Sequence, residues 1–392
     1  MRSYLPSVAD ASRTAEFPAA GTSPADVTAW WNSLTPQEQQ QLIADRPDLV
    51  GPLDGVSAVA RDQANRKLLD AAIMGLTVSG GNPGLLRTLT NLRNKLDEGG
   101  TLLVNGQDGN APMAAPGDDQ LLSPQMFLLG FSPDGQGRAI IAAGNPDTAD
   151  NVVAYVPGMG TYLSDHFVSK DVLHAQNIAV AAGQADPSHT TSAVIWLGYD
   201  APQVTGGAAD WAHELDITGT GDADAGAPAY QHFLAGLRAA NTSGDLNLTA
   251  LGHSYGSLLV GKASQLPGGL GVDNVVIVGS PGVGFDHASQ FGIDPSHVWA
   301  AAAANDPVPK STTGPAPQQW PFRSSAHTGP CSTTTRAADG SVRTPPIRRS
   351  ALTGSPFQRA APAPLGCKPT ANASTGPTAG PEAPRSNRSH GS

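Results

Sequence analysis

A Gly-x-Ser-x-Gly pattern centred on Ser254 is typical of the nucleophile turn of hydrolytic enzymes. Leucines precede the pattern in LNLTALGHS and follow it in SLLV, so the sequence predicts a strand, a sharp turn at the serine and a helix. Such a turn strains the serine backbone, and a side chain at Gly252 or Gly256 would clash. Ser254 is therefore the candidate nucleophile. The alternative is an ordinary turn that contains a serine.

A serine hydroxyl becomes an effective nucleophile when a base takes its proton and hydrogen-bond donors receive the developing charge. Those donors are expected from the amide after the serine and from a loop after an early strand. VPGMGT, residues 156–161, follows the strand-like NVVAYV, and its glycines let the backbone approach a ligand. We predict that the Met159 and Tyr255 amides form an oxyanion hole. A plain glycine turn at 156–161 is the alternative.

The acid of a serine triad is expected after the nucleophile, at the carboxyl end of a later strand. The segment VWAAAAANDPVP places Asp306 at the end of an apolar run, so Asp306 is the candidate acid. An Asp-Pro turn start is the structural alternative for this residue. Asp286, which follows the preceding strand-like run, is the second candidate.

The histidine of the triad is the least clear of the three residues. Only His327 and His390 follow Asp306, and no strand-like run precedes either of them. His253 adjoins the serine and is expected to point away from it, while His287 is expected to cap a helix or lie near the mouth of the site. His327, in SSAHTGP, is the candidate base.

The first of the elements that must position these residues is a helical N-terminal region, residues 1–105. Ser23-Pro24 and Thr35-Pro36 each place a capping residue and a proline ahead of an acid, as at helix starts. Leucines at 85, 86, 89, 92 and 96 give a further helix an apolar stripe. The small and polar residues of 106–124 are expected to form a linker.

Residues 125–310 are predicted to form an α/β core with a mostly parallel sheet and helices on both faces. Two apolar runs flank Asp134-Gly135, which is a hairpin signal. Helical stretches near 165–182, 226–241 and 255–266 then separate most of the later runs, which are NVVAYV, SAVIWLGYD, LNLTALGHS, NVVIVGSPGVG and HVWAAAAANDPVP. Alternation of this kind is typical of parallel sheets that are covered on both faces.

Residues 311–392 are predicted to form a disordered, basic tail. They hold 13 prolines, and 9 Lys or Arg against 2 Asp or Glu. Their few large apolar residues cannot offset about 1–2 kcal/mol of backbone ordering entropy per residue. The same mixture of residues results when GC-rich coding DNA is read in another frame. A frameshift near Lys310 is therefore the alternative to a genuine tail.

Composition limits the partners and cofactors. The formal charge is −10, and the acidic residues concentrate before the tail, so nucleic-acid binding is not expected. Cys331 and Cys367 both lie in the tail without neighbours at metal-ligand spacing, so no structural zinc and no other cofactor is expected. No apolar run is long enough to predict a transmembrane segment, and we expect no secretory signal. A cytoplasmic location is the default expectation, with non-classical export as the alternative. No partner of the helical region is indicated.

With these residues in view, the chain resembles a bacterial α/β-hydrolase family of unassigned function that is distantly similar to cutinases and lipases. The resemblance runs from about Pro24 to Lys310 and includes TAWWNSLTPQEQQQLIADRPDLVGPLDGVSAVARDQANRKLL, VPGMGT, WLGYDAP, ALGHSYGS, VGSPGVG and AAAANDPVP. It implies an α/β-hydrolase core, Ser254 as nucleophile and Asp306 as acid. It also implies serine-type hydrolysis of an ester or related acyl bond.

The chain departs from this family after the Asp-Pro segment, where family members continue with a strand-bearing region that contains a histidine. Two functions therefore stay open. The first is a serine hydrolase that acts on a small-molecule acyl substrate through an acyl-enzyme and is impaired if its histidine is lost. The second is a catalytically inactive, hydrolase-like binding or scaffold protein.

Overall fold

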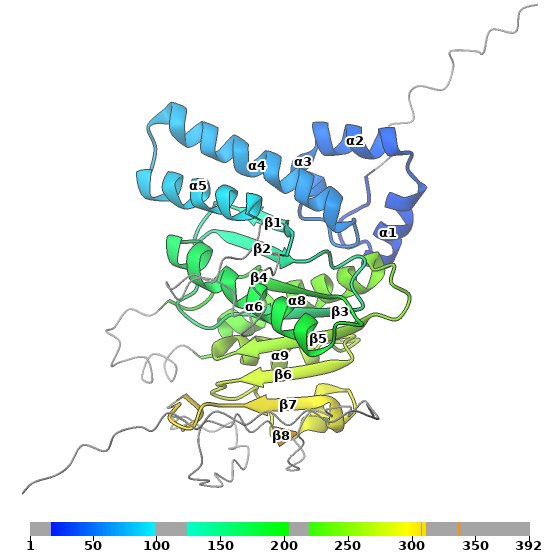
Figure 1. Cartoon of the computed structure of the whole chain (residues 1–392), viewed down its shortest axis with the longest axis vertical. Helices are drawn as coiled ribbons and strands as arrows, with labels where there is room; N and C mark the ends of the chain where they lie inside the picture. The colour runs from blue at the N-terminus through cyan, green and yellow to red at the C-terminus, as the bar shows by residue number, and fades with distance from the viewer. Residues whose placement is uncertain (1–16, 99–123, 204–218, 307, 311–335, 338–392) are drawn as a thin grey trace, which may run out of the picture. The chain divides into compact units, whose positions relative to one another are not determined.

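The computed structural model describes residues 17–98, 124–203, 219–306, 308–310 and 336–337, and these residues build a mixed eight-stranded sheet (Figure 1). The order of the strands across the sheet is β1-β2-β4-β3-β5-β6-β7-β8. β4, β3, β5, β6 and β7 run parallel, whereas β1, β2 and β8 are antiparallel to their neighbours. The bounds of the strands are β1 (Met126–Ser132), β2 (Arg138–Ala143), β3 (Asn151–Val156), β4 (Thr191–Leu197), β5 (Asn247–His253), β6 (Asn274–Val278), β7 (Val298–Ala301) and β8 (Arg336–Ala337). The predicted α/β class is confirmed.

Helices cover both faces of the sheet because successive side chains on each strand point to opposite sides. On β3, Ala154 packs in one apolar cluster with α8 (Gly221–Ala240) and α9 (Tyr255–Ser264). Its neighbour Tyr155 belongs to the cluster of the opposite face, with α5 (Pro83–Asp97) and α6 (Val172–Ala185). A π-helical turn (Phe167–Asp171) leads into α6. Short 3₁₀ turns lie at Ala288–Phe291, Pro295–His297 and Val308–Lys310.

The predicted helix starts of the N-terminal region are present. Ser23 Oγ accepts a hydrogen bond from the Asp26 N–H at the start of α1 (Pro24–Ser33). Thr35 and Glu38 form a reciprocal capping box at the start of α2 (Pro36–Asp45), and these hydrogen bonds to Thr35 lower the pKa of Glu38. α3 (Pro47–Val50) and α4 (Ala58–Ser79) then precede α5. All described residues belong to one compact unit, 1–344.

Two predicted regions fall largely outside the described residues. The expected linker at 106–124 is described only at its last residue, and of the tail after 310 only Arg336–Ala337 is described. Those two residues pair as β8 with β7. Within the described parts, no helix combines the length and the apolar composition needed to cross a membrane.

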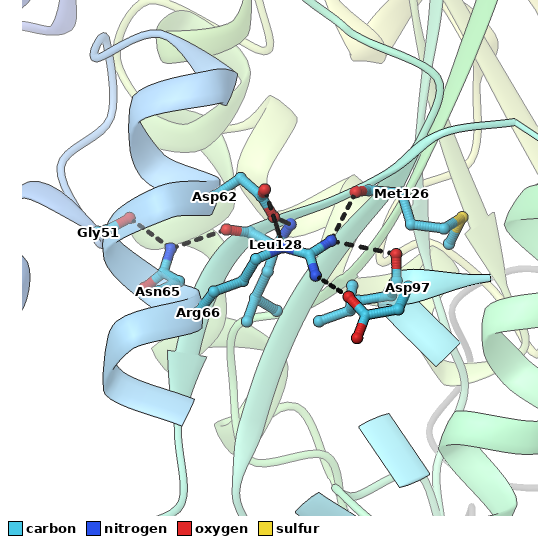
Figure 2. A network of polar contacts seen from close by, with 8 residues as sticks. Gly51, Asp62, Asn65, Arg66, Asp97, Met126 and Leu128 are labelled. Atoms are coloured by element: carbon cyan, nitrogen blue, oxygen red, sulfur yellow. Dashed lines mark hydrogen bonds and ion pairs between the residues drawn. The ribbon is translucent and has the colours of Figure 1, made fainter. Parts of the chain in front are cut away.

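Side chains of α4 satisfy the backbone of β1 along its free edge (Figure 2). Asp62 Oδ1 accepts a hydrogen bond from the Leu128 N–H at 2.7 Å, and Asn65 Nδ2 donates to Leu128 O at 2.9 Å. Arg66 donates to Met126 O at 3.1 Å. An unpaired strand edge is a template for pairing with another chain. In this fold, α4 occupies that edge in place of a further strand.

We predict that Asp62→Ala lowers the free energy of unfolding by about 2 kcal/mol. The Leu128 N–H loses its carboxylate acceptor, and Arg66 loses the partly buried partner of one of its ion pairs. Urea unfolding measures this loss. The matched control is Asp70→Ala, also on α4, whose contact with Arg93 is exposed and 3.7 Å long. This control is expected to change stability by less than about 0.5 kcal/mol. Equal losses in the two variants would contradict the edge-covering role.

Charged side chains also join the N-terminal region to α8. Asp54 makes ion pairs of 2.9 Å with Arg61 and with His232 of α8, and the bond to Asp54 raises the pKa of His232. The Arg61 guanidinium lies 5.7 Å from the centre of the Phe233 ring. The backbones approach closely here, since a Cβ built on Gly236 would lie 2.7 Å from Asp54 Cβ. The N-terminal helices are thus bound to the core at two separate places.

Asp147 makes the stability of the contact between the N-terminal helices and the core depend on pH. It accepts a hydrogen bond of 2.6 Å from the Ala58 N–H at the start of α4, and burial raises its pKa to about 6 against the opposing effects of that bond and of Arg61. The folded chain therefore binds a proton more tightly than the unfolded chain. The contribution of Asp147 to stability is full below about pH 4 and is lost as the pH rises through about 6. The raised pKa of His232 acts in the same direction.

We therefore expect Asp147→Asn, which keeps an acceptor for the Ala58 N–H without the charge, to flatten the fall in stability between about pH 4 and 7. At pH 7 the variant should be more stable than the natural chain by on the order of 2 kcal/mol. Denaturant unfolding across this pH range measures both effects. An unchanged slope would show that Asp147 is not the titrating group.

Candidate functional site

Ser254 occupies a strained turn between β5 and α9. Among the described residues it is the only non-glycine residue with a positive φ, at φ 52° and ψ −127°. A backbone conformation of this kind costs of order 1–3 kcal/mol and persists only where the surroundings enforce it. The Ser254 N–H donates to Val278 O, at the end of β6, at 3.0 Å. The strand, turn and helix predicted around the serine are all present.

Three glycines make room for this turn. A Cβ on Gly252 would lie 2.5 Å from the Cα of Ser257, and one on Gly256 would overlap Val156 O at the end of β3. A Cβ on Gly158 would lie 2.8 Å from Ser254 Cβ and 3.2 Å from its Oγ. The 156–161 loop therefore lies directly against the half-buried serine.

The two amides predicted as oxyanion donors have no acceptor within the part of the chain that the structure describes. The Gly160 N–H, one residue beyond Met159, donates to Pro202 O at 2.7 Å and fixes the loop. Neither the Met159 N–H nor the Tyr255 N–H donates to a described residue. Free amides beside a serine hydroxyl are the arrangement that stabilises a developing oxyanion.

Asp306 reaches the same edge of the sheet from the segment after β7. Its Oδ2 lies 2.8 Å from the position that a Cβ would take on Gly279, which directly follows β6. The preceding residue, Val278, is the one bonded to the Ser254 N–H. The Val308 N–H donates to Asp306 Oδ1 at 3.0 Å and holds the carboxylate in place. The candidate nucleophile thus follows β5 and the candidate acid follows β7, and β6 lies between these two parallel strands.

His253 lies beside Asp306, although sequence reasoning gave it no role in the site. Its Cδ2 and Nε2 lie 3.7 Å from the Gly279 Cβ position that also faces Asp306. The His253 side chain is exposed at the surface, yet packing around the ring lowers its pKa. His174 of α6 lowers this pKa further, while Asp306 raises it. No local sequence signal distinguishes this histidine, because its neighbours come from other strands and helices.

The remaining candidates have different positions. His327 and His390 lie outside the described residues, so the base stays a prediction. Asp286 and His287 stand at the start of the 3₁₀ turn Ala288–Phe291, where the N–H groups of both donate to Gln290 Oε1 at 3.1 and 2.9 Å. Their position at a helix start agrees with the capping role considered for His287.

Comparison with known proteins gives relatives in mycobacteria. The profile of a family described as alpha/beta hydrolase matches residues 132–314. The uncharacterised protein Rv2079 of Mycobacterium tuberculosis is 32% identical over 308 residues, which are 75% of this chain and 45% of that protein. The uncharacterised protein Rv0963c of the same species is 31% identical over 250 residues, 60% of this chain and 90% of that protein. The chain spans about half the length of the first of these relatives.

The solved structures that resemble this chain do so only weakly. A hyperthermophilic esterase from the archaeon Pyrobaculum calidifontis is 15% identical and aligns over 63% of this chain and 59% of its own, with a TM-score of 0.24. A likeness of this size carries no argument about the chain.

The strain at Ser254 predicts a gain in stability when glycine replaces the serine. Ser254→Gly relieves the positive φ and should raise the free energy of unfolding by about 1 kcal/mol, after allowance for the greater freedom of glycine in the unfolded chain. Ser254→Ala keeps the strain and should leave stability within about 0.5 kcal/mol of the natural chain. Thermal and urea unfolding compare the two variants. A glycine variant that is no more stable than the alanine variant would contradict the strain.

Proposed function

Because the chain belongs to the alpha/beta hydrolase family, we propose that it is a serine hydrolase that cleaves an ester or a related acyl bond through an acyl-enzyme. The observation that carries this proposal is the strained turn at Ser254, with the glycine loop 156–161 against its hydroxyl. Strain of this kind clusters at functional sites. The small-molecule acyl substrate is part of the proposal.

The roles of the residues follow from the chemistry of acyl transfer. Ser254 Oγ attacks the carbonyl carbon while a histidine takes its proton, and the carbonyl oxygen becomes negatively charged. The Met159 and Tyr255 amides donate hydrogen bonds to that oxygen. The protonated histidine gives its proton to the leaving group as the tetrahedral intermediate collapses. Water then attacks the acyl carbon while the histidine takes a proton from it. The bond between that carbon and Ser254 Oγ breaks, the histidine returns the proton to Oγ, and the carboxylic acid leaves.

Asp306 orients the histidine and stabilises its charged form, as the acid does in other triads. Its support is its place beside Gly279, on the edge of the sheet where Ser254 stands. We assign the base to His327, the candidate with a position after the acid in the chain. Loss of a triad histidine lowers kcat by roughly 10⁶. A chain without this histidine would bind acyl compounds without turnover, which is the rival function.

A fluorophosphonate probe tests the proposal, because it forms a covalent bond with an activated serine. We expect rapid labelling of the full chain, located at Ser254 by peptide mass, and loss of labelling in His327→Ala. The matched control is His297→Ala. His297 lies just before β7, at the opposite edge of the sheet from Ser254, and its Nδ1 contacts Asp273 O at 3.0 Å.

The control variant should be labelled at the rate of the natural chain. An unlabelled Ser254 in the natural chain would overturn the proposal in favour of binding without turnover. Full-rate labelling of His327→Ala would instead remove His327 from the mechanism and direct attention to His253.

A further inference from the structure

We propose that Gln203 and Tyr255 are positioning residues that hold the two candidate oxyanion amides by tying them to the connection between β4 and α8. The described flanks of this connection are residues 198–203 and 219–220. One flank is bonded to the loop that carries the Met159 amide, and the other is bonded to the side chain of Tyr255. This inference rests on the proposed serine hydrolase function and concerns the same site.

The first flank fixes the Met159 amide from the side of the loop. Pro202 O accepts the hydrogen bond of the Gly160 N–H at 2.7 Å. The next residue, Gln203, places its Nε2 3.3 Å from Thr161 O, so two consecutive residues of the flank hold the loop. On its other side Met159 adjoins Gly158, which lies against Ser254. The Met159 amide is therefore confined between two anchored neighbours.

Gln203 must be a hydrogen-bond donor at this position. Besides Thr161 O, its Nε2 lies 2.8 Å from Ala201 O and 2.7 Å from Gln136 Oε1. Gln136 belongs to the turn of the β1–β2 hairpin, so one side-chain amide joins three segments that are far apart in the sequence. Every partner is an oxygen, and a carboxylate of the same shape could not replace the amide.

The second flank fixes the Tyr255 amide through the tyrosine side chain. The Tyr255 hydroxyl donates to Gly219 O at 3.1 Å and accepts from the Ala223 N–H, in the first turn of α8, at 3.3 Å. The ring is almost fully buried, and burial raises the pKa of the hydroxyl to about 12, which keeps it a donor. An ion pair of 2.9 Å between Lys262 and Asp224 also joins α9 to α8. Residue 255 is thus anchored at its side chain while its N–H stays free.

Anchoring of this kind matters most in the transition state. Oxyanion donors act by being fixed in advance where charge develops, and the loss of one donor costs about 10²–10³ in kcat. A loosened donor is expected to retain part of that effect, so we expect about a tenfold loss. The neutral carbonyl oxygen of the bound substrate interacts less strongly with these amides than the oxyanion does. The change should therefore appear in kcat with KM unchanged.

The experiment compares Gln203→Glu, Gln203→Leu and Tyr255→Phe with the natural full-length chain. Each should lower kcat on p-nitrophenyl butyrate, and the rate of fluorophosphonate labelling at Ser254, by about tenfold. Gln203→Glu keeps the shape of the side chain but faces three oxygens with a carboxylate, so it should lose as much as Gln203→Leu. Hydrogen exchange at the Gly160 and Ala223 amides, which donate to Pro202 O and to the Tyr255 hydroxyl, is a readout independent of turnover and should become faster.

Two matched controls remove similar hydrogen bonds elsewhere. Gln231→Leu loses bonds of 3.0 and 2.7 Å to Pro267 O and Gly269 O, and Tyr230→Phe loses a buried bond of 2.8 Å to Ala154 O. Both are expected to lose stability because hydrogen bonds are removed, and circular dichroism and thermal unfolding record that loss. Neither should change kcat or the exchange of the two amides.

The outcomes separate this inference from the proposed function. If the natural chain is labelled at Ser254 and all three variants react and exchange at its rates, the positioning role is wrong while the serine hydrolase stands. The role is equally wrong if the controls slow kcat as much as the variants do. If the natural chain is not labelled at all, the serine hydrolase fails, and this inference fails with it.

Discussion

The backbone at Ser254 is the constraint on which the site depends. A serine at φ 52° is unfavourable by itself, and the surrounding structure has to maintain it. Its N–H donates to Val278 O on β6. On the side of β3, Gly158 lies so close to Ser254 that a Cβ on this glycine would clash with the serine side chain. Since β3 and β6 flank β5 in the sheet, the turn is held from both neighbouring strands. The strand order therefore decides where the hydroxyl points and which loop faces it.

Parallel strands bring the other components to the same place. The carboxyl ends of β3, β4, β5, β6 and β7 share one edge, and ligands of open α/β sheets bind outside such ends. The glycine loop, the flank with Gln203, the serine and Asp306 each follow one of these strands. The hairpin turn with Gln136 reaches the same edge because β2 runs antiparallel to β4. Residues from across the core thus meet without any long-range signal in the sequence.

The N-terminal helices are part of this core and not a separable cap. Leu69 of α4 and Leu89 of α5 belong to the apolar cluster that covers one face of the sheet. Asp62 and Asn65 satisfy the backbone of β1, and Asp54 holds His232 of α8. The sheet would otherwise end in an unpaired strand, which favours association with other chains. A sheet of this order is complete only with its helical region.

The sequence by itself determined the local elements: the strand, turn and helix at Ser254, the hairpin at Asp134-Gly135 and the capped starts of α1 and α2. These depend on interactions between residues a few positions apart, which periodicity and turn residues encode. Only the tertiary structure decided that Asp62 serves Leu128, 66 residues away, and that His232 meets Asp54 across 178 residues. It also decided that Gln203 meets Gln136 and Thr161, and that His253 lies beside Asp306. Contacts of this kind follow from strand order and helix packing, and no local pattern of polar residues specifies them.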